Sequence, residues 1–111
     1  MTNLEYRAFR KAARLIERNK QRYNFWEGKT PTEERGQGCP AAWIGYYLGM
    51  DSYAGEVTKE RLGVSLLVFL ERLGVLVGEA WQENHRLAAK ALRLYADKYY
   101  RKEVKVRKST G

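Results

Sequence analysis

The sequence predicts an all-α fold, a small single-domain bundle of about four helices with one long loop. In several segments apolar residues recur at steps of three and four, as they do on the buried side of a helix. Glycine and proline cluster between these segments and interrupt the helical pattern. The length of 111 residues suits one domain. We therefore treat residues 1–111 as a single helical domain, with a frayed tail expected at residues 105–111.

The first helix is expected from about Leu4 to Arg22. Thr2 and Glu5 have the spacing of a capping box, in which the threonine hydroxyl accepts from the amide three residues later. When each residue advances the helix by 100°, the apolar residues gather on one side and predict a buried face. These residues are Phe9, Ala12, Ala13, Ile16 and Tyr23.

The long loop is expected at residues 24–40, where glycines and prolines break the periodicity. Within it, Thr30–Glu33 is a plausible short helical turn with Pro31 in its first position. A loop of this length in a small domain is often functional, or else mobile. A second helix is then expected to begin at Pro40 and to be closed by Gly49. Because it is apolar on nearly every side, it should lie in the middle of the core.

A third helix is expected over Lys59–Leu73, with Thr58 as its N-cap and Gly74 as its stop. Residues 75–77 could form a short strand or a buried link, since short apolar runs are ambiguous. The fourth helix should run to about Lys102. It could begin near Glu79 or, with Asn84 as its cap, near His85.

The formal net charge of +8 is concentrated at the two ends of the chain. Residues 1–22 hold seven basic and two acidic residues, which gives +5, and residues 86–111 hold nine and two, which gives +7. Residues 23–85 hold five basic and nine acidic residues, which gives −4. This asymmetry indicates an anionic partner for the two ends.

The basic residues of the first helix form a stripe about 80° wide, opposite its apolar side. Neighbours four residues apart in and beside this stripe are like-charged, and each such pair costs a few tenths of a kcal/mol. A surface for an anionic ligand explains this pattern. A solvated face, or one neutralised by the acidic middle segment, is the alternative. The candidate binding residues are Arg7, Lys11, Arg14, Arg18 and Arg22 of the first helix and Arg86, Lys90 and Arg93 of the last.

Nucleic acid is the natural partner of such a surface, because arginine fits phosphate oxygens and neutralising phosphates releases counterions. No motif for sequence-specific readout is present, so contact with the phosphate backbone is expected. Tyr23, Trp26, Tyr99 and Tyr100 lie in or near the basic segments and could stack on bases. Trp26 is interpreted either as a lid on the core or as an anchor for a protein partner. The alternative function is a small regulator or inhibitor that docks on an acidic protein surface.

Few catalytic signatures are present, and we expect a protein that is not an enzyme and uses no cofactor or metal. A thiolate at Cys39, stabilised by the start of the second helix, could pair with His85, but packing roles explain both residues. The single cysteine excludes an internal disulfide and suits a cytoplasmic protein. No secretory signal is visible, and residues 62–78 are too short to span a membrane. The sequence leaves the oligomeric state open.

Three segments together resemble a family of small, mostly uncharacterised helical proteins of bacteria and their phages. The segments are LIERNKQRYNFWEG, GCPAAWIGYYLG and AWQENHRLAAKALRLYA. They contain a tryptophan in a loop, a cysteine before a small apolar helix, and a tryptophan before the last helix. The resemblance implies a helical fold and an origin in a mobile element, and it implies no particular activity.

Overall fold

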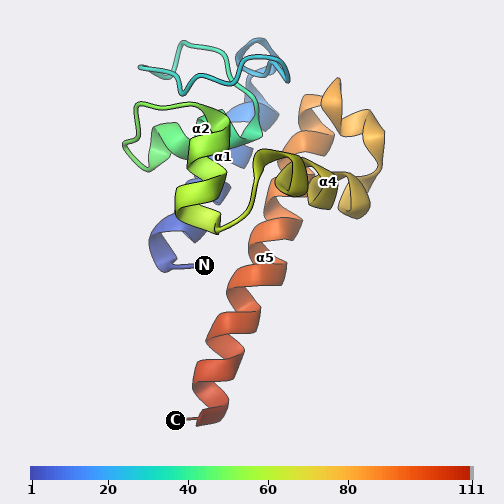
Figure 1. The fold of residues 1–111 in the computed structure, drawn as a ribbon. Coiled ribbons are helices and arrows are strands. Elements are labelled where there is room, and N and C mark those ends of the chain that lie inside the picture. Colours follow the sequence, from blue (N-terminus) through green and yellow to red (C-terminus); the bar gives the residue numbers. More distant parts are fainter. Residues whose placement is uncertain (111) are drawn as a thin grey trace.

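The computed structural model describes the backbone of residues 1–110 and the side chains of residues 1–100. Within this part of the chain the predicted all-α fold is confirmed, with five α-helices, three short helical turns and no strand (Figure 1). The α-helices are α1 (Asn3–Arg18), α2 (Pro40–Tyr47), α3 (Ala54–Val57), α4 (Leu66–Val77) and α5 (His85–Thr110). The short turns are η1 (Lys20–Arg22), η2 (Thr58–Leu62) and η3 (Glu79–Gln82).

α1 begins at its predicted cap but ends at Arg18 rather than Arg22. Thr2 Oγ1 accepts a hydrogen bond from the Glu5 amide at 3.3 Å, and the Thr2 hydroxyl donates to the Glu5 carboxylate. At the other end Asn19 leaves the helical conformation, and its side-chain amide donates to the carbonyl four residues earlier at 3.0 Å. This hydrogen bond satisfies a carbonyl that the helix end leaves unpaired. The chain therefore turns away from the helix axis at Asn19.

The long loop is tied to the connector that follows α2. Thr30 is buried; its amide donates to the Ser52 carbonyl at 2.9 Å and its hydroxyl to the Met50 carbonyl at 3.0 Å. The short helical turn predicted to start at Thr30–Glu33 is not formed: this part of the loop holds a single turn, in which the Gly36 amide donates to the Glu33 carbonyl at 3.1 Å, while Thr30 lies against the segment after α2. Gly45 of α2 permits this approach, since a Cβ there would lie 2.5 Å from Thr30 Cγ2.

α2 agrees closely with its prediction. Pro40 is its first residue, and Gly49 follows it in the left-handed conformation with φ of 72°. Trp43 and Ile44 are fully buried, so this helix does lie in the core. The Trp43 indole Nε1 donates to the carbonyl of Arg22 at 2.8 Å, which joins α2 to η1.

The third predicted helix is wrong in its bounds, because two helices occupy this part of the chain. Thr58 caps nothing; it is buried, and its hydroxyl donates to the Gly55 carbonyl at 3.1 Å, as it can inside a continuous helical segment. Gly63, with φ of 71°, ends η2 in a left-handed conformation that glycine adopts readily. Ser65 then caps α4 by accepting from the Val68 amide at 3.2 Å.

α4 also continues through the predicted stop at Gly74. Residues 75–77, which the sequence left undecided between a strand and a link, form the last turn of α4. The helix ends before Gly78, which has φ of 82°. The positive-φ glycine that ends this helix is therefore Gly78, four residues after the predicted one.

α5 begins at His85 with Asn84 as its cap, which is one of the two predicted starts. Asn84 Oδ1 accepts from the amides two and three residues later, at 3.0 and 3.2 Å. The helical backbone continues to Thr110, past the predicted end near Lys102. The frayed tail expected at residues 105–111 lies outside the residues whose side chains are described and stays a prediction.

α1, α4 and α5 share one aromatic core. The ring of Phe9 on α1 stacks on that of Tyr95 on α5, with centroids 5.3 Å apart. Phe69 on α4 lies edge-on to both rings, at 6.1 and 5.1 Å. α2 packs on α1, and the long α5 passes both α1 and α4 (Figure 1). The solvent sides of α1 and α4 therefore point away from a common centre.

Candidate polyanion-binding face

The solvent side of α1 carries four of the predicted binding residues. Arg7, Lys11, Arg14 and Arg18, which we call the α1 stripe, are exposed, whereas the apolar side of the helix is buried. Within the described part of the chain, the side chains of Arg7, Arg14 and Arg18 form no ion pair and no hydrogen bond. These three charges are not neutralised by direct contact with a carboxylate.

Arg22 does not belong to the α1 stripe. It lies in η1, beyond the end of α1, and its Nη1 donates to the Arg35 carbonyl at 2.7 Å. Its own carbonyl accepts from the Trp43 indole and from the Gly38 amide at 3.1 Å. The prediction that Arg22 continues the stripe is wrong because the helix ends four residues earlier, and these contacts hold the long loop in place.

An open groove of about 400 Å³ follows one side of the α1 stripe. Lys11, Arg14 and Arg18 line it from α1, while Tyr47 of α2 and Glu34 of the long loop line it from across. Lys11 Nζ lies 6.0 Å from the centre of the Tyr47 ring. Burial raises the pKa of Tyr47, and the nearby charge of Glu34 adds to this effect. The apolar pattern around Tyr47 predicted only a core role and did not reveal this position.

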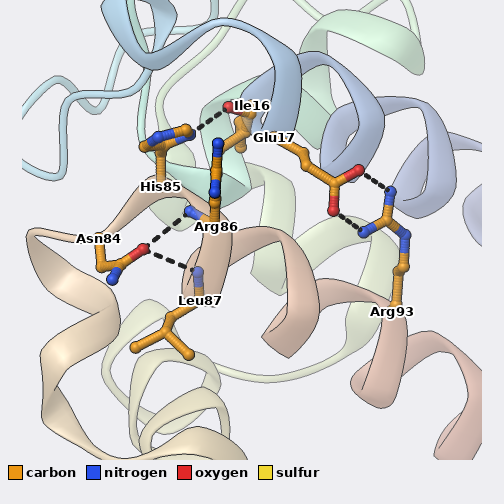
Figure 2. Close-up of polar contacts among 7 residues, drawn as sticks. All are labelled: Ile16, Glu17, Asn84, His85, Arg86, Leu87 and Arg93. Atoms are coloured by element: carbon orange, nitrogen blue, oxygen red, sulfur yellow. Dashed lines mark hydrogen bonds and ion pairs between the residues drawn. The ribbon is translucent and has the colours of Figure 1, made fainter.

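Two polar contacts fix the register of α1 against α5. The Tyr6 hydroxyl donates to Asp97 Oδ1 at 2.9 Å, near the start of α1. Near its end, His85 Nδ1 lies 3.0 Å from the Ile16 carbonyl (Figure 2). The two helices are therefore antiparallel, with the first turn of α5 beside the last turn of α1.

This register brings the predicted basic residues of the two helices together. It places the start of α5, which carries Arg86 and Lys90, beside the second half of α1, which carries Arg14 and Arg18. Arg86 and Lys90 are exposed, and their side chains form no hydrogen bond or ion pair with the described residues. Arg18 of α1 and Arg86 of α5 both lower the pKa of Glu17, so basic side chains of the two helices lie near one another at this end of α1.

Arg93, the remaining predicted residue, is paired within the protein. Its Nη1 and Nη2 donate to the two carboxylate oxygens of Glu17 at 2.6 and 3.1 Å (Figure 2). These hydrogen bonds, and then the charges of Arg93, Arg18 and Arg86, lower the pKa of Glu17. Basic residues of both helices therefore surround one carboxylate, which the sequence analysis counted only in the net charge. The position of Glu17 next to the basic stripe on α1 is the sequence feature that could have predicted this role.

Three of the four aromatic residues considered for base stacking make contacts inside the protein. The Tyr23 hydroxyl donates to a backbone carbonyl of η3 at 2.9 Å. The Tyr99 ring packs on Tyr95 at 4.4 Å, and the Tyr100 ring packs on Tyr6 at 4.3 Å. The ring contacts of Tyr99 and Tyr100 compete with stacking on a base, and the hydrogen bond of Tyr23 ties its ring to η3.

Trp26 is the exception, because 86% of its surface is exposed. Its ring lies nearly perpendicular to that of Phe25, with the two centroids 4.8 Å apart. The interpretation of Trp26 as a lid on the core is therefore wrong, and an anchor for a protein partner stays a prediction.

Cys39 and His85 show no catalytic pairing in the described residues. Cys39 is 4% exposed, and burial raises the pKa of its thiol although amides at the start of α2 act in the opposite direction. His85 contacts the Ile16 carbonyl instead.

Among the described residues no cluster of three or more histidine, cysteine or acidic side chains could hold a metal ion. No helix in residues 1–110 has both the length and the hydropathy to cross a bilayer.

Comparisons with protein-family models, curated proteins and solved structures found no match for this chain. The resemblance to small helical proteins of bacteria and phages stays a prediction. The function is therefore argued from the geometry and charge of the surface alone.

Proposed function

We propose that the protein is a non-enzymatic, cytoplasmic binding module that contacts nucleic acid or another polyanion through phosphate-type contacts. The contact surface, which we call the basic face, spans the outer sides of α1 and of the start of α5. It consists of Arg7, Lys11, Arg14, Arg18, Arg86 and Lys90.

The observation that carries this proposal is the alignment of unpaired cations from two helices. Arg14 and Arg18 lie in the second half of α1, beside the start of α5 with Arg86 and Lys90, and none of the four forms an ion pair with the described residues. Like charges on neighbouring helices repel one another, and bound phosphates would reduce that repulsion. Because the chain contains no motif for reading base edges, the proposal includes no base specificity.

A salt titration of binding tests this function. Fluorescence anisotropy with labelled duplex DNA, single-stranded DNA and single-stranded RNA would be measured from low to moderate salt. If all six residues contact phosphates, log K against log salt should fall with a slope of about −5 for a duplex, from roughly 0.9 per contact. Absence of binding to all three at low salt would overturn the proposal. It would leave a regulator that docks on an acidic protein surface as the remaining function.

A further inference from the structure

α4 carries large apolar residues on its solvent side as well as on its core side. Phe69 and Leu73 are fully buried in the core. On the outer side Leu67 is 78% exposed, Val75 is 81% exposed and Val68 is 37% exposed. An outer helix face normally carries polar residues, so this row of apolar side chains lacks a partner within the described chain.

A groove runs along this face of α4 and continues onto other elements. It has a volume of about 630 Å³ and is lined by Leu67, Leu70, Val75, Trp81 and Phe25, among others. The rings of Phe25 and Trp81 pack edge-to-face at 5.3 Å. Phe25 also contacts the exposed Trp26, which extends the apolar surface beyond the groove. We call the groove itself the α4 groove, and Trp26 lies at its edge.

The charged residues that line the α4 groove are Glu71 and Glu79, and both are acidic. This is the reverse of the basic face and of the chain as a whole, whose net charge is +8. An apolar groove edged by carboxylates complements a ligand that has apolar side chains and also lysine or arginine.

We propose that the α4 groove binds an amphipathic helix of another protein, with apolar anchors on one face and lysine or arginine beside them. A helix suits the shape, since α4 has 12 residues and offers a wall about 18 Å long for anchors spaced three and four residues apart. Trp26 would cover one side of the docked helix, because exposed tryptophan is a frequent hot spot at protein interfaces. This proposal does not depend on binding by the basic face.

A second copy of this chain fits the α4 groove less well. Pairing of two α4 helices about a two-fold axis would bring Glu71 of each copy towards the other. Arg72, the adjacent cation, is turned towards α5. Its Nη1 donates to the Tyr95 hydroxyl at 3.4 Å, and its guanidinium lies 5.3 Å from the Tyr99 ring centre. Arg72 of the second copy is therefore held by its own α5 and is not free to neutralise Glu71.

The probe for this proposal is a synthetic amphipathic helical peptide of leucine and lysine, compared with a leucine–glutamate peptide of the same apolar pattern. Binding to the full chain would be followed through the backbone amide chemical shifts of α4 and η3, which separates the groove from the basic face. The lysine peptide should shift these amides, and the glutamate peptide should not. Glu71→Lys with Glu79→Lys should reverse this preference. Leu67→Asp should weaken binding of the lysine peptide at least tenfold, whereas Leu4→Asp, at another exposed leucine, should not.

Two results would overturn the proposal. In the first, the lysine peptide leaves the α4 and η3 amides unshifted, or the double variant Glu71→Lys with Glu79→Lys still prefers the lysine peptide over the glutamate peptide. In the second, sedimentation velocity shows a dimer that Leu67→Asp dissociates and that the peptide cannot displace, which would assign the α4 groove to a second copy.

Discussion

The basic face and the α4 groove both destabilise the isolated protein, the first through repulsion between like charges and the second through apolar side chains exposed to water. On the basic face, the exposed cations Arg14 and Lys90 form no ion pair with any carboxylate of the described residues. In the α4 groove, apolar side chains such as Leu67 and Val75 face solvent, and the charges beside them are negative. The first pattern suits a uniform anion such as a phosphate backbone, and the second suits a specific protein segment.

One core supports both surfaces and holds them apart. On α1, Phe9 points inward and the α1 stripe points outward. On α4, Phe69 points inward and the groove lies on the outer side. Since the two rings meet at 6.1 Å, the two faces point away from one another. We expect that a polyanion and a partner helix can bind at the same time.

The largest effect is expected from Phe69→Ala, which should damage both faces together. The fully buried ring contacts Phe9 and Tyr95, so its removal leaves a cavity where α1, α4 and α5 meet. The free energy of unfolding in urea should fall by about 3–5 kcal/mol. A loss below about 1 kcal/mol would show that the faces do not depend on a shared core.

The next largest effect is expected from Arg14→Glu combined with Lys90→Glu, which should affect the basic face alone. Affinity for duplex DNA should fall at least tenfold, and the salt slope should lose about two units because two phosphate contacts are lost. Anisotropy titrations measure both quantities. Lys59→Glu with Lys98→Glu makes the same change in net charge at exposed positions outside the basic face. Equal losses in the two double variants would mean that only net charge matters.

The part of the fold that depends on local signals could be predicted from the sequence. The Thr2 cap, the apolar side of α1, the Pro40 start of α2 and the Asn84 cap of α5 all agree with the structure. Each depends on residues within a few positions of one another, where capping and periodicity act directly. The exposed basic side of α1 followed from the same periodicity.

The parts that the sequence did not predict depend on contacts between distant segments. Thr58 and Ser65 are both good helix caps by residue type, but Thr58 has helical backbone angles because the chain is already helical from Ala54, so only Ser65 acts as a cap. The pairing of Glu17 with Arg93 joins residues 76 positions apart and follows from the register of α1 against α5. The exposed apolar side of α4 could not be distinguished from a buried one, because an apolar stretch looks the same in either case.

A smaller effect is expected from Glu17→Gln, which removes the one carboxylate paired within the basic surface. The Arg93 pair is partly exposed, so the loss in unfolding free energy should be only about 0.2–1 kcal/mol at neutral pH. Because the folded-state pKa of Glu17 lies below its ordinary value of 4.5, this stability is present above pH 4.5. It disappears as the pH falls through the lowered pKa, so the two proteins should then be equally stable.

The same variant should bind duplex DNA more tightly and steepen the salt slope by about one unit, because Arg93 becomes available to a phosphate. Glu60→Gln, at an exposed position on η2, removes one negative charge without releasing Arg93 and serves as the control. Urea unfolding from pH 7 to pH 3 and anisotropy titrations measure the two effects. If the two variants behave alike, the Glu17–Arg93 pair neither links the helices nor restrains Arg93.

The smallest effect on stability is expected from Leu67→Ser, and it compares the two sides of α4 directly. Leu67 is 78% exposed, so the unfolding free energy should change by no more than about 0.5 kcal/mol. Leu73→Ser makes the same change at a fully buried position of the same helix. It should lower the unfolding free energy by about 2–5 kcal/mol, the range for truncating a buried leucine. Urea unfolding of both variants gives the two values. A large loss for Leu67→Ser would mean that this side chain is needed for folding, and the outer side of α4 would then no longer require a partner to explain it.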